Sequence, residues 1–539
     1  MSGKADKGEN MNAGLSAENS AGKRDCFARS DSAARKLAEQ ESANRDFESR
    51  DFDGHDFVEW VLIENGLELP VPVESNSTVK SETVKSEAAE PEATESQTAE
   101  QAAQSGTESG SAAGKAAEPH SVSGVSGRSP RLRVHGFTQP WQEKKFSDLA
   151  VIRRGLTYKP GNVVSEGIRV LRSSNINEDV FELHDDDVFV EDESVNIPYV
   201  ENGDILITSA NGSNRLVGKH ALICGIEENS AVHGGFMLAA SSAVPDFVNA
   251  LMGSSWYSKF ISTYVAGGNG AIGNLKKSDL DEQPVFVPSD MEEQRLVGRF
   301  FSGLDRIISV QERKTELLRL SKKYFLQNMF PRRGESAPRL RVHGFTQPWQ
   351  TRKLEDFGSS YGGLSGKNKD DFGHGDASFV TYKNVFLNPV ADLDNVGSVE
   401  IDLSQNEVRY GDVFFTVSSE IPEEVGMSSV WVGKSENVYL NSFCFGYRPD
   451  DESVDPFFMA YMLRSDEVRR KLIFLAQGIS RYNISKKAVL KIEVKLPSME
   501  EQRLVGRFFS GLDRIIRVQE RKTEALRQAK KYYLQNMFA

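Results

Sequence analysis

The sequence predicts an α+β protein in which one structural unit occurs twice, and three observations support this prediction. A helix-forming segment occurs at Glu292–Phe330 and again at Glu500–Phe538, and the two copies differ at five positions. A second block, PRLRVHGFTQPWQ, occurs at Pro130–Gln142 and at Pro338–Gln350. Both repeats have the same offset of 208 residues. A block, a variable stretch and a helix therefore form a tandem repeat.

The repeated helix carries an apolar residue every three or four positions, as at Phe300, Leu304 and Ile308, with charged residues between them. This spacing predicts one apolar stripe along a helix. At ~1.5 Å per residue the helix is roughly 58 Å long. A stripe of this length cannot be buried within its own segment. We therefore expect the two copies to pack on each other, as structural spacers without chemistry of their own.

The repeat divides the chain into five parts. The predicted parts are a mostly disordered acidic low-complexity tail (1–129), a first domain (130–291), a first spacer helix (292–330), a linker with a second domain (331–499) and a second spacer helix (500–539). From Glu74 the tail is rich in Ala, Glu, Ser, Thr and Gly, and such a segment cannot offset its ordering entropy by burial. An apolar stretch at 56–69 is either a minor local element or a docking segment.

The two variable stretches have little identity but share a frame. In the first, strands are predicted at 168–176, 203–210, 219–226, 236–243 and 285–288. A helix is predicted at Asp246–Val265, before a Gly-rich basic loop. In the second, the sequence GDVFFT at Gly411 matches GDILIT at Gly203, and a helix is predicted at Pro456–Gln477. A common frame with a different surface is what two domains need in order to recognise different targets.

Composition limits the function classes. The net charge is −13, but residues up to Ser129 carry −11 and the remainder carries −2, so any nucleic-acid face is a local patch. Three cysteines without a pairing pattern fit a reducing cytoplasm. The sequence has no secretory signal and no run of about 18 apolar residues, so we expect no membrane span. The histidines lack metal-ligand spacing, so no metal site is expected.

The repeated helices that end in LQNMF, the GD-apolar-Thr strands and the loops GNLKKSDL and SRYNISKKAVL resemble the specificity subunit of type I restriction-modification systems. The resemblance implies two target-recognition domains related by pseudo-twofold symmetry and separated by two antiparallel helices in a coiled coil. Each domain is expected to recognise one half of a split DNA sequence. The subunit is expected to be non-catalytic and to carry no cofactor.

The resemblance also implies partners. Two modification subunits would methylate adenine with S-adenosylmethionine, and motor-nuclease subunits with ATP and Mg²⁺ would cleave DNA. Since duplex DNA has twofold axes perpendicular to its length, a quasi-symmetric protein can place both domains on it in equivalent poses. The helices would then set the gap between half-sites, nominally ~34–36 Å. The near-identity of the repeats also suggests recombination that exchanges the domains.

Direct recognition of bases needs amide, arginine or hydroxyl groups on exposed loops, and lysines suit phosphates. The candidates in the first domain are Asn211, Asn214, Arg215, Asn269, Asn274, Lys276 and Lys277. The candidates in the second domain are Tyr361, Lys367, Ser418, Ser419, Gln477, Ser480, Arg481, Tyr482, Asn483, Lys486 and Lys487.

Two other function classes stay open at this point: a DNA-processing enzyme and a coiled-coil protein-interaction scaffold. Asn196-Ile-Pro-Tyr199 is one residue from the Asn-Pro-Pro-Tyr of adenine methyltransferases, but no Gly-rich cofactor loop accompanies it, so we interpret it as an extended turn. Glu493 and Lys495 fit a loose nuclease pattern. An alternating strand explains them more simply. The sequence thus predicts no catalytic residue.

Overall fold

The computed structural model describes residues 71–72, 129–265, 273–450 and 454–539, and these fall into two compact units. One unit combines described residues between 58 and 305 with residues 528–539, and the other holds those between 306 and 527. Each unit therefore contains one variable domain and a part of both long helices. The predicted tail and its stretch at 56–69 lie outside the described residues, apart from β1 (Val71–Pro72), which pairs with β2 (Leu132–Arg133).

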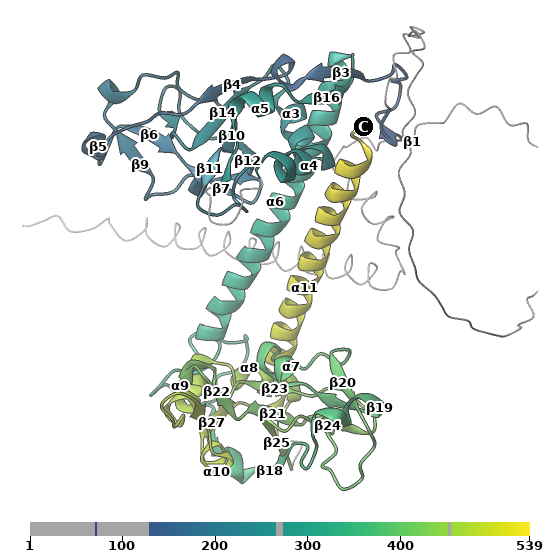
Figure 1. Ribbon diagram of the computed structural model, residues 1–539. Helices are drawn as coiled ribbons and strands as arrows, with labels where there is room; N and C mark the ends of the chain where they lie inside the picture. The colour runs from purple at the N-terminus through teal and green to yellow at the C-terminus, as the bar shows by residue number, and fades with distance from the viewer. Residues whose placement is uncertain (1–70, 73–128, 266–272, 451–453) are drawn as a thin grey trace, which may run out of the picture. The chain divides into compact units, whose positions relative to one another are not determined.

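The two long helices are α6 (Met291–Asn328) and α11 (Met499–Asn536), and each has 38 residues (Figure 1). Both end two residues before their predicted ends at Phe330 and Phe538. The amide of Met329 still donates to the carbonyl of Phe325 at 2.7 Å, so the difference concerns the frayed last turn. Among the described helices, none combines the length and apolar content that crossing a bilayer requires.

The helices run antiparallel where they pair within the unit of residues 306–527. Arg319 Nη2 donates to Glu520 Oε1 at 2.7 Å, and Arg527 Nη2 donates to Glu312 Oε1 at 2.7 Å. Arg527 is the residue equivalent to Arg319 under the repeat offset of 208 residues, and Glu520 is the residue equivalent to Glu312. Each ion pair is therefore the repeat-related copy of the other. This reciprocal pairing confirms the predicted antiparallel helices and indicates a local pseudo-twofold relation between them.

The predicted apolar stripe forms the seam between the helices. Phe325 and Phe508 pack edge to face with ring centroids 4.9 Å apart. In the other unit the equivalent residues Phe300 and Tyr533 pack in the same way at 5.0 Å. Leu304 is fully buried. Because the same contact recurs at positions related by the repeat, near-identical helices are suited to pairing with each other.

Each variable domain is built around an antiparallel four-stranded sheet. In the first domain the order is β12 (His220–Leu222), β10 (Ile205–Thr208), β14 (Met237–Ser241) and β4 (Val151–Arg154). In the second domain the order is β23 (Ser428–Val430), β21 (Val413–Thr416), β25 (Cys444–Pro449) and β18 (Gly358–Gly362). The two orders correspond strand for strand, which confirms the shared frame.

A second sheet lies in each domain. It has the order β13 (Ala231–His233), β6 (Ile168–Leu171), β9 (Val188–Val190) and β5 (Val163–Val164) in the first domain. It has the order β20 (Val396–Val399), β19 (Phe372–Val380) and β24 (Val438–Leu440) in the second. The β13–β6 and β19–β24 pairs are parallel. Strands β4, β9 and β13 were not predicted from the sequence.

Shorter elements complete the domains. Three further pairs of strands are β3 (Gln142–Lys145) with β16 (Pro284–Val287), β17 (Gln350–Lys353) with β27 (Glu493–Leu496) and β7 (Ile176–Asn177) with β8 (Val180–Phe181). The short helix α7 (Tyr382–Leu387) lies in the second domain. Single 3₁₀ turns occur at η1 (Phe146–Asp148), η2 (Pro160–Asn162), η3 (Ser173–Asn175), η4 (Asp192–Ser194), η5 (Leu354–Asp356), η6 (Lys369–Asp371) and η7 (Pro422–Glu424).

The prediction of one helix per domain was wrong, because each is broken into two. The first domain has α3 (Pro245–Met252) and α4 (Ser255–Tyr264), and the second has α8 (Pro456–Met462) and α9 (Asp466–Phe474). In the first domain, the residue before α4 has an extended backbone (φ −82°, ψ 172°), which interrupts the helical hydrogen bonds. The amphipathic pattern continues across the break, so periodicity alone did not reveal it.

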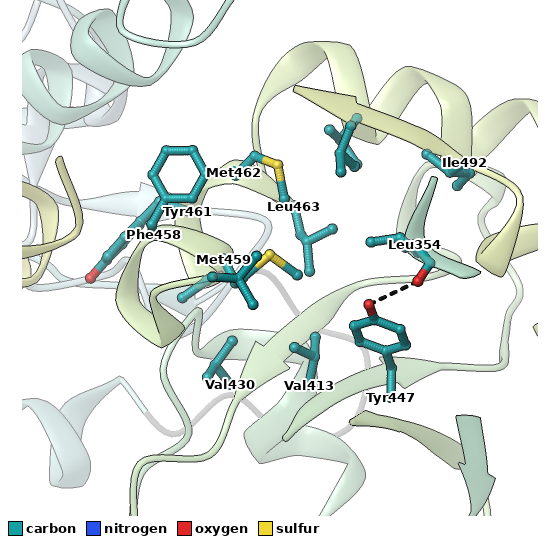
Figure 2. Close-up of a cluster of buried hydrophobic side chains, with 14 of the residues drawn as sticks. Leu354, Val413, Val430, Tyr447, Phe458, Met459, Tyr461, Met462, Leu463 and Ile492 are labelled. Carbon is teal, nitrogen blue, oxygen red and sulfur yellow. Dashed lines mark hydrogen bonds between the residues drawn. The ribbon is translucent and has the colours of Figure 1, made fainter. Parts of the chain in front are cut away.

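The second domain packs its broken helix against the sheet and the start of the domain. Figure 2 shows Met459, Met462 and Leu463 beside Val413 and Val430 of the sheet. In the same cluster the hydroxyl of Tyr447 donates to the carbonyl of Leu354 at 2.9 Å, so the one polar atom of a buried ring is satisfied. The core thus joins β21 to the broken helix and to the start of the domain.

The repeated PRLRVHGFTQPWQ block binds the start of a long helix through a buried ion pair. Arg133 Nε and Nη2 donate to Glu293 at 2.6 and 2.8 Å, and Arg341 Nε and Nη2 donate to Glu501 at 2.8 and 2.9 Å. Both carboxylates are 1% exposed. Bidentate pairs of this kind fix geometry as well as charge. The identity of the block therefore reflects a specific contact with the repeated EEQ segment.

Candidate nucleic-acid interface

The candidate loops of each domain meet in a small two-stranded sheet. In the first domain β11 (Ala210–Asn211) pairs with β15 (Gly273–Asn274), and in the second β22 (Ser418–Ser419) pairs with β26 (Tyr482–Asn483). We call each of these pairs the small sheet of its domain. β11 and β22 follow directly after the central strands β10 and β21. Loops that are about 60 residues apart in the sequence are therefore held together by main-chain hydrogen bonds.

The small sheet of the first domain carries amide side chains with defined partners. Asn211 Nδ2 donates to Ser173 Oγ at 3.1 Å, and Asn211 Oδ1 accepts from the amide of Ser213 at 2.9 Å. Asn214 Oδ1 accepts from the amide of Gly273 at 3.1 Å, and so ties the two candidate loops together. These bonds orient both amides, and within the part of the chain that the structure describes the Asn214 amino group has no hydrogen-bond acceptor.

Arginine and lysine flank this sheet. Arg215 is exposed and makes no side-chain hydrogen bond or ion pair with another residue that the structure describes. Asn274 and Lys276 are exposed beside it. Lys277 pairs with Asp281 within α5 (Lys277–Asp281), so part of its charge is already compensated. The remaining candidate of the first domain, Asn269, lies outside the described residues.

The second domain presents its candidates on a tight hairpin. The main chains of Gln477 and Asn483 exchange two hydrogen bonds, of 2.9 and 2.8 Å, and so close the loop between them. The enclosed residues Ser480 and Arg481 are exposed, and Tyr482 is half-buried. Lys486 and Lys487 are exposed at the start of α10 (Lys486–Leu490). Arginine is one of the side chains that can donate to base edges, and Arg481 is exposed on this closed hairpin.

A cavity of ≈ 490 Å³ lies next to this hairpin. Residues of the small sheet, of α7 and of the following loop line it: Tyr382, Phe386, Ser418, Ser419, Glu420, Ile421, Glu424, Phe443 and Arg481. The rings of Tyr382 and Phe386 stack with centroids 6.1 Å apart. The Ser419 hydroxyl donates to Glu424 at 2.9 Å. The hollow therefore combines aromatic surface, two carboxylates and one guanidinium.

Two of the sequence-predicted candidates are engaged inside the second domain instead. The Tyr361 hydroxyl donates to Asp412 Oδ2 at 2.6 Å, and burial raises the pKa of this phenol. Lys367 forms an ion pair with Asp402 at 2.8 Å, and this hydrogen bond raises the pKa of the ammonium group. Neither joins the small sheet, and the structure gives both side chains a partner within the domain.

The loop beyond β22 is held by a half-buried arginine of α9. Arg469 donates to the carbonyls of Gly426, Glu423 and Val425 at 2.7 to 2.9 Å. Burial lowers the pKa of this guanidinium to about 10, so it remains charged at neutral pH. Arg469 therefore fixes the loop that contains Glu424, one of the residues that line the cavity.

Comparison with known proteins agrees with this geometry. A family model described as the type I restriction modification DNA specificity domain matches residues 346–528, which include the small sheet of the second domain. A putative type I restriction enzyme MjaX specificity subunit from Methanocaldococcus jannaschii is 24% identical over 213 residues, which make up 38% of this chain and 48% of that protein. Residues 346–528 of this chain are therefore similar to the DNA specificity domain of type I restriction-modification systems.

Other type I specificity subunits are similar to this chain at comparable levels. The MjaVIII specificity subunit of the same organism is 21% identical over 272 residues, which cover 45% of this chain and 58% of that protein. The chain thus spans about half the length of the curated relatives that it matches. The crystal structure of a type I restriction-modification S subunit from M. genitalium covers 76% of this chain and 99% of its own, with 14% identity and a TM-score of 0.46.

The residues of the two enzyme-like sequence patterns make hydrogen bonds within the chain. The Tyr199 hydroxyl donates to Asp192 at 2.7 Å, and the Tyr199 carbonyl accepts from Arg153 at 2.9 Å, in a segment without regular structure. Lys495 extends from β27 to the carbonyl of Glu335. Within the described ranges, no cluster of three His, Cys, Asp or Glu residues is arranged to hold a metal ion.

Sequence reasoning missed three residues that line the cavity beside the second small sheet. Glu420 and Glu424 bring carboxylates to the cavity, and carboxylates accept hydrogen bonds from the cytosine amino group. Phe443 lines the same cavity although it lies 38 residues before Arg481. No local pattern marks these residues, because the fold alone brings them beside the small sheet.

Proposed function

We propose that this chain is the DNA-recognition subunit of a type I restriction-modification complex, and that each domain recognises one half of a split DNA sequence. The observation that carries the proposal is the repeated small sheet. Both domains present exposed amide, arginine or lysine side chains at the same place in a shared frame. Such groups can contact base edges and phosphates, and the frame holds them in a fixed orientation.

The paired helices support a spacing role. Their contacts are reciprocal, and their sequences are almost identical, so they can hold two domains in equivalent surroundings. In this proposal they set the gap between the two half-sites. The duplicated surface also offers two near-identical docking positions, which agrees with two modification subunits per chain.

Catalysis in this proposal lies on the partners. The modification subunits use S-adenosylmethionine to methylate adenine, and motor-nuclease subunits use ATP and Mg²⁺. The chain itself contributes recognition and position, with no cofactor and no catalytic residue, and it acts in the cytoplasm on double-stranded DNA.

Methylome sequencing of cells that express the chain with its modification subunit tests this function. We expect a bipartite adenine motif in which two defined half-sites flank a gap of unspecified bases. The lysines and arginines predict binding that weakens steeply as salt increases. A purified chain that cleaves DNA with Mg²⁺ and no partner would instead favour the enzyme alternative, and a complex without salt-dependent DNA binding would favour a scaffold.

Lengthening both helices tests the spacing role separately. Seven residues inserted after Thr315 and seven after Thr523 add about 10 Å while keeping the apolar stripe in phase. The gap in the methylated motif should then grow by about three base pairs, at ~3.4 Å each. The same seven residues added after Ala539 provide the control. An unchanged gap in the lengthened chain would remove the helices as the spacing device.

A further inference from the structure

One exposed phenylalanine occupies the same turn in both domains. In the first domain the Met237 amide donates to the Gly234 carbonyl at 2.8 Å, and in the second the Cys444 amide donates to the Asn441 carbonyl at 3.3 Å. The third residue of the turn is Phe236 in the first domain and Phe443 in the second. Their exposed fractions are 73% and 60%.

Each of these turns is joined to the small sheet of its domain. The carbonyl of Phe236 accepts from the amides of Ser209 and Ala210 at 2.9 and 3.0 Å. The carbonyl of Phe443 accepts from the amide of Val417 at 3.0 Å. Ser209 and Val417 are equivalent under the repeat offset of 208 residues. Both phenylalanines therefore stand where the central strand passes into the small sheet.

The second domain shows which way this ring faces. Phe443 lines the cavity of ≈ 490 Å³ that Arg481, Ser418 and Ser419 also line. An aromatic ring and three candidate polar residues thus share one hollow. Ile421, which is 49% exposed, adds a second apolar side chain to the same wall.

A packing role does not explain these two residues. Single exposed apolar side chains are common on protein surfaces, but turns usually carry Gly, Asn, Asp or Ser at such positions. The residues before the phenylalanine differ between the domains, Gly234-Gly235 in one and Asn441-Ser442 in the other. The exposed phenylalanine recurs on a turn whose preceding two residues differ between the domains, which indicates a function for the ring itself.

We propose that Phe236 and Phe443 are specificity-determining residues that each contact the C5 methyl group of a thymine in their own half-site. The proposal rests on the proposed DNA-recognition function. In the major groove the thymine methyl is the apolar group that base pairs expose, and phenylalanine is among the side chains that contact it. Neighbouring arginine and amide groups supply the hydrogen bonds to adjacent bases, while the ring selects an A·T pair.

The test compares Phe236→Ala and Phe443→Ala chains, each assembled with the modification subunit, on duplexes that carry the wild-type methylated motif. We expect each variant to lose about five-fold in affinity, the lower range for one base-pair mismatch. The loss from Phe443→Ala should disappear when deoxyuridine replaces thymine in the half-site of the second domain, and Phe236→Ala should respond to the other half-site. Methylome motifs should relax at one position of the matching half.

Tyr410→Ala provides the matched control, because Tyr410 is 51% exposed in the same domain but precedes β21, whereas Phe443 adjoins its far end. The proposal is overturned by wild-type affinity in both phenylalanine variants, by equal losses on thymine and deoxyuridine duplexes, or by lost assembly with the modification subunit at intact folding. A wild-type chain that yields no bipartite motif would instead remove the proposed function itself, so the two failures are distinguishable.

Discussion

In the two variable domains, carbonyl groups at equivalent positions of the repeat accept hydrogen bonds from different kinds of side chain. The carbonyl of Gly218 in the first domain accepts from the Tyr257 hydroxyl at 2.9 Å, whereas the equivalent carbonyl of Gly426 accepts from Arg469 at 2.7 Å. Both donors lie on the second short helix of their domain. The loop after the small sheet is therefore fixed in each domain, but by a neutral group in one and a charged group in the other.

The aspartate of the GD-apolar-Thr sequence shows the same contrast. Asp204 accepts from Arg153 and from the Ser241 hydroxyl, while Asp412 accepts from Arg448 and from the Tyr361 hydroxyl. Tyr361 occupies the position that Arg153 has in the first domain. A buried carboxylate needs partners, but the fold does not prescribe which residue supplies them. The frame thus fixes where polar groups must be satisfied, and each domain satisfies them independently.

The buried pairs that anchor the repeated blocks offer the largest test of this comparison. Glu293→Gln should leave Arg133 buried without its charged partner and cost about 3–5 kcal/mol. Glu501→Gln should cost less, because the Arg341 side chain is 15% exposed and the Arg133 side chain only 5%. Hydrogen exchange of the backbone amides of residues 142–145 and 350–353 measures the free energy of local opening in each half separately. Glu292→Gln, at an exposed carboxylate, is the control, and equal effects in both halves would contradict the ranking.

Acid should destabilise the first domain more than the second. Burial lowers the pKa of His233 to about 4, whereas an unfolded histidine titrates near ~6.5. The unfolded state therefore binds an extra proton between these values. The contribution of His233 to the free energy of unfolding is therefore fully present above about pH 6.5. It falls by about 3 kcal/mol as the pH decreases toward 4. Burial also lowers the pKa of His220, which acts in the same direction.

The second domain has Asn441 and Ser428 where the first has these histidines. Hydrogen exchange of β10 and β14 followed against pH, with β21 and β25 of the same chain as the internal reference, measures the difference. His233→Asn should remove most of the acid loss. Parallel acid loss in both domains would show that the histidine is not its source.

Two helix glycines permit a close approach that a side chain would block. A Cβ at Gly298 would lie 2.7 Å from the Phe247 amide nitrogen, and a Cβ at Gly506 would lie 2.7 Å from the Phe458 amide nitrogen. Alanine favours a helix by about 1 kcal/mol over glycine, but overpacking against backbone costs about 1–3 kcal/mol. We expect a net loss from either alanine variant. A stabilised variant in thermal unfolding would show that the short helix can shift away.

The helix ion pairs should give the smallest effect. Arg319→Glu should cost about 0.2–1 kcal/mol, because both partners of the Arg319–Glu520 pair are substantially exposed. The double variant with Glu520→Arg should recover most of it. Repeating the cycle at Glu312 and Arg527 should give the same coupling, since the two pairs are exchanged by the repeat. Thermal unfolding at low and high salt measures both cycles, and unequal couplings would weaken the inferred symmetry.

Much of the fold could be predicted from the sequence, because the repeat indicates the duplicated elements directly. The long helices, their pairing and the strands at GDILIT and GDVFFT follow from periodicity and from the common offset. The broken helices could not be predicted, because the break at Ser254 keeps the apolar spacing intact. Short strands such as β9 and β13 have three residues each, too few to show alternation.

The candidate site, like the fold, could be predicted only in part from the sequence. The loops around Asn211 and Arg481 were predicted because polar and glycine-rich segments mark turns, and the structure pairs each of them in a small sheet. Tyr361 and Lys367 resembled them in composition, but their partners Asp412 and Asp402 are 51 and 35 residues away and engage them inside the domain. Composition identifies a polar loop; it does not reveal whether the polar atoms are already bonded.

The amino-acid sequence by itself determined the duplicated architecture and the pairing of its helices, because a long apolar stripe has to be buried and an almost identical stripe is available in the same chain. Only the tertiary structure decided which side chains surround each small sheet. Residues such as Phe443 and Arg481 come from different strands and turns, and long-range sheet pairing, which has no local signature, brings them to one cavity.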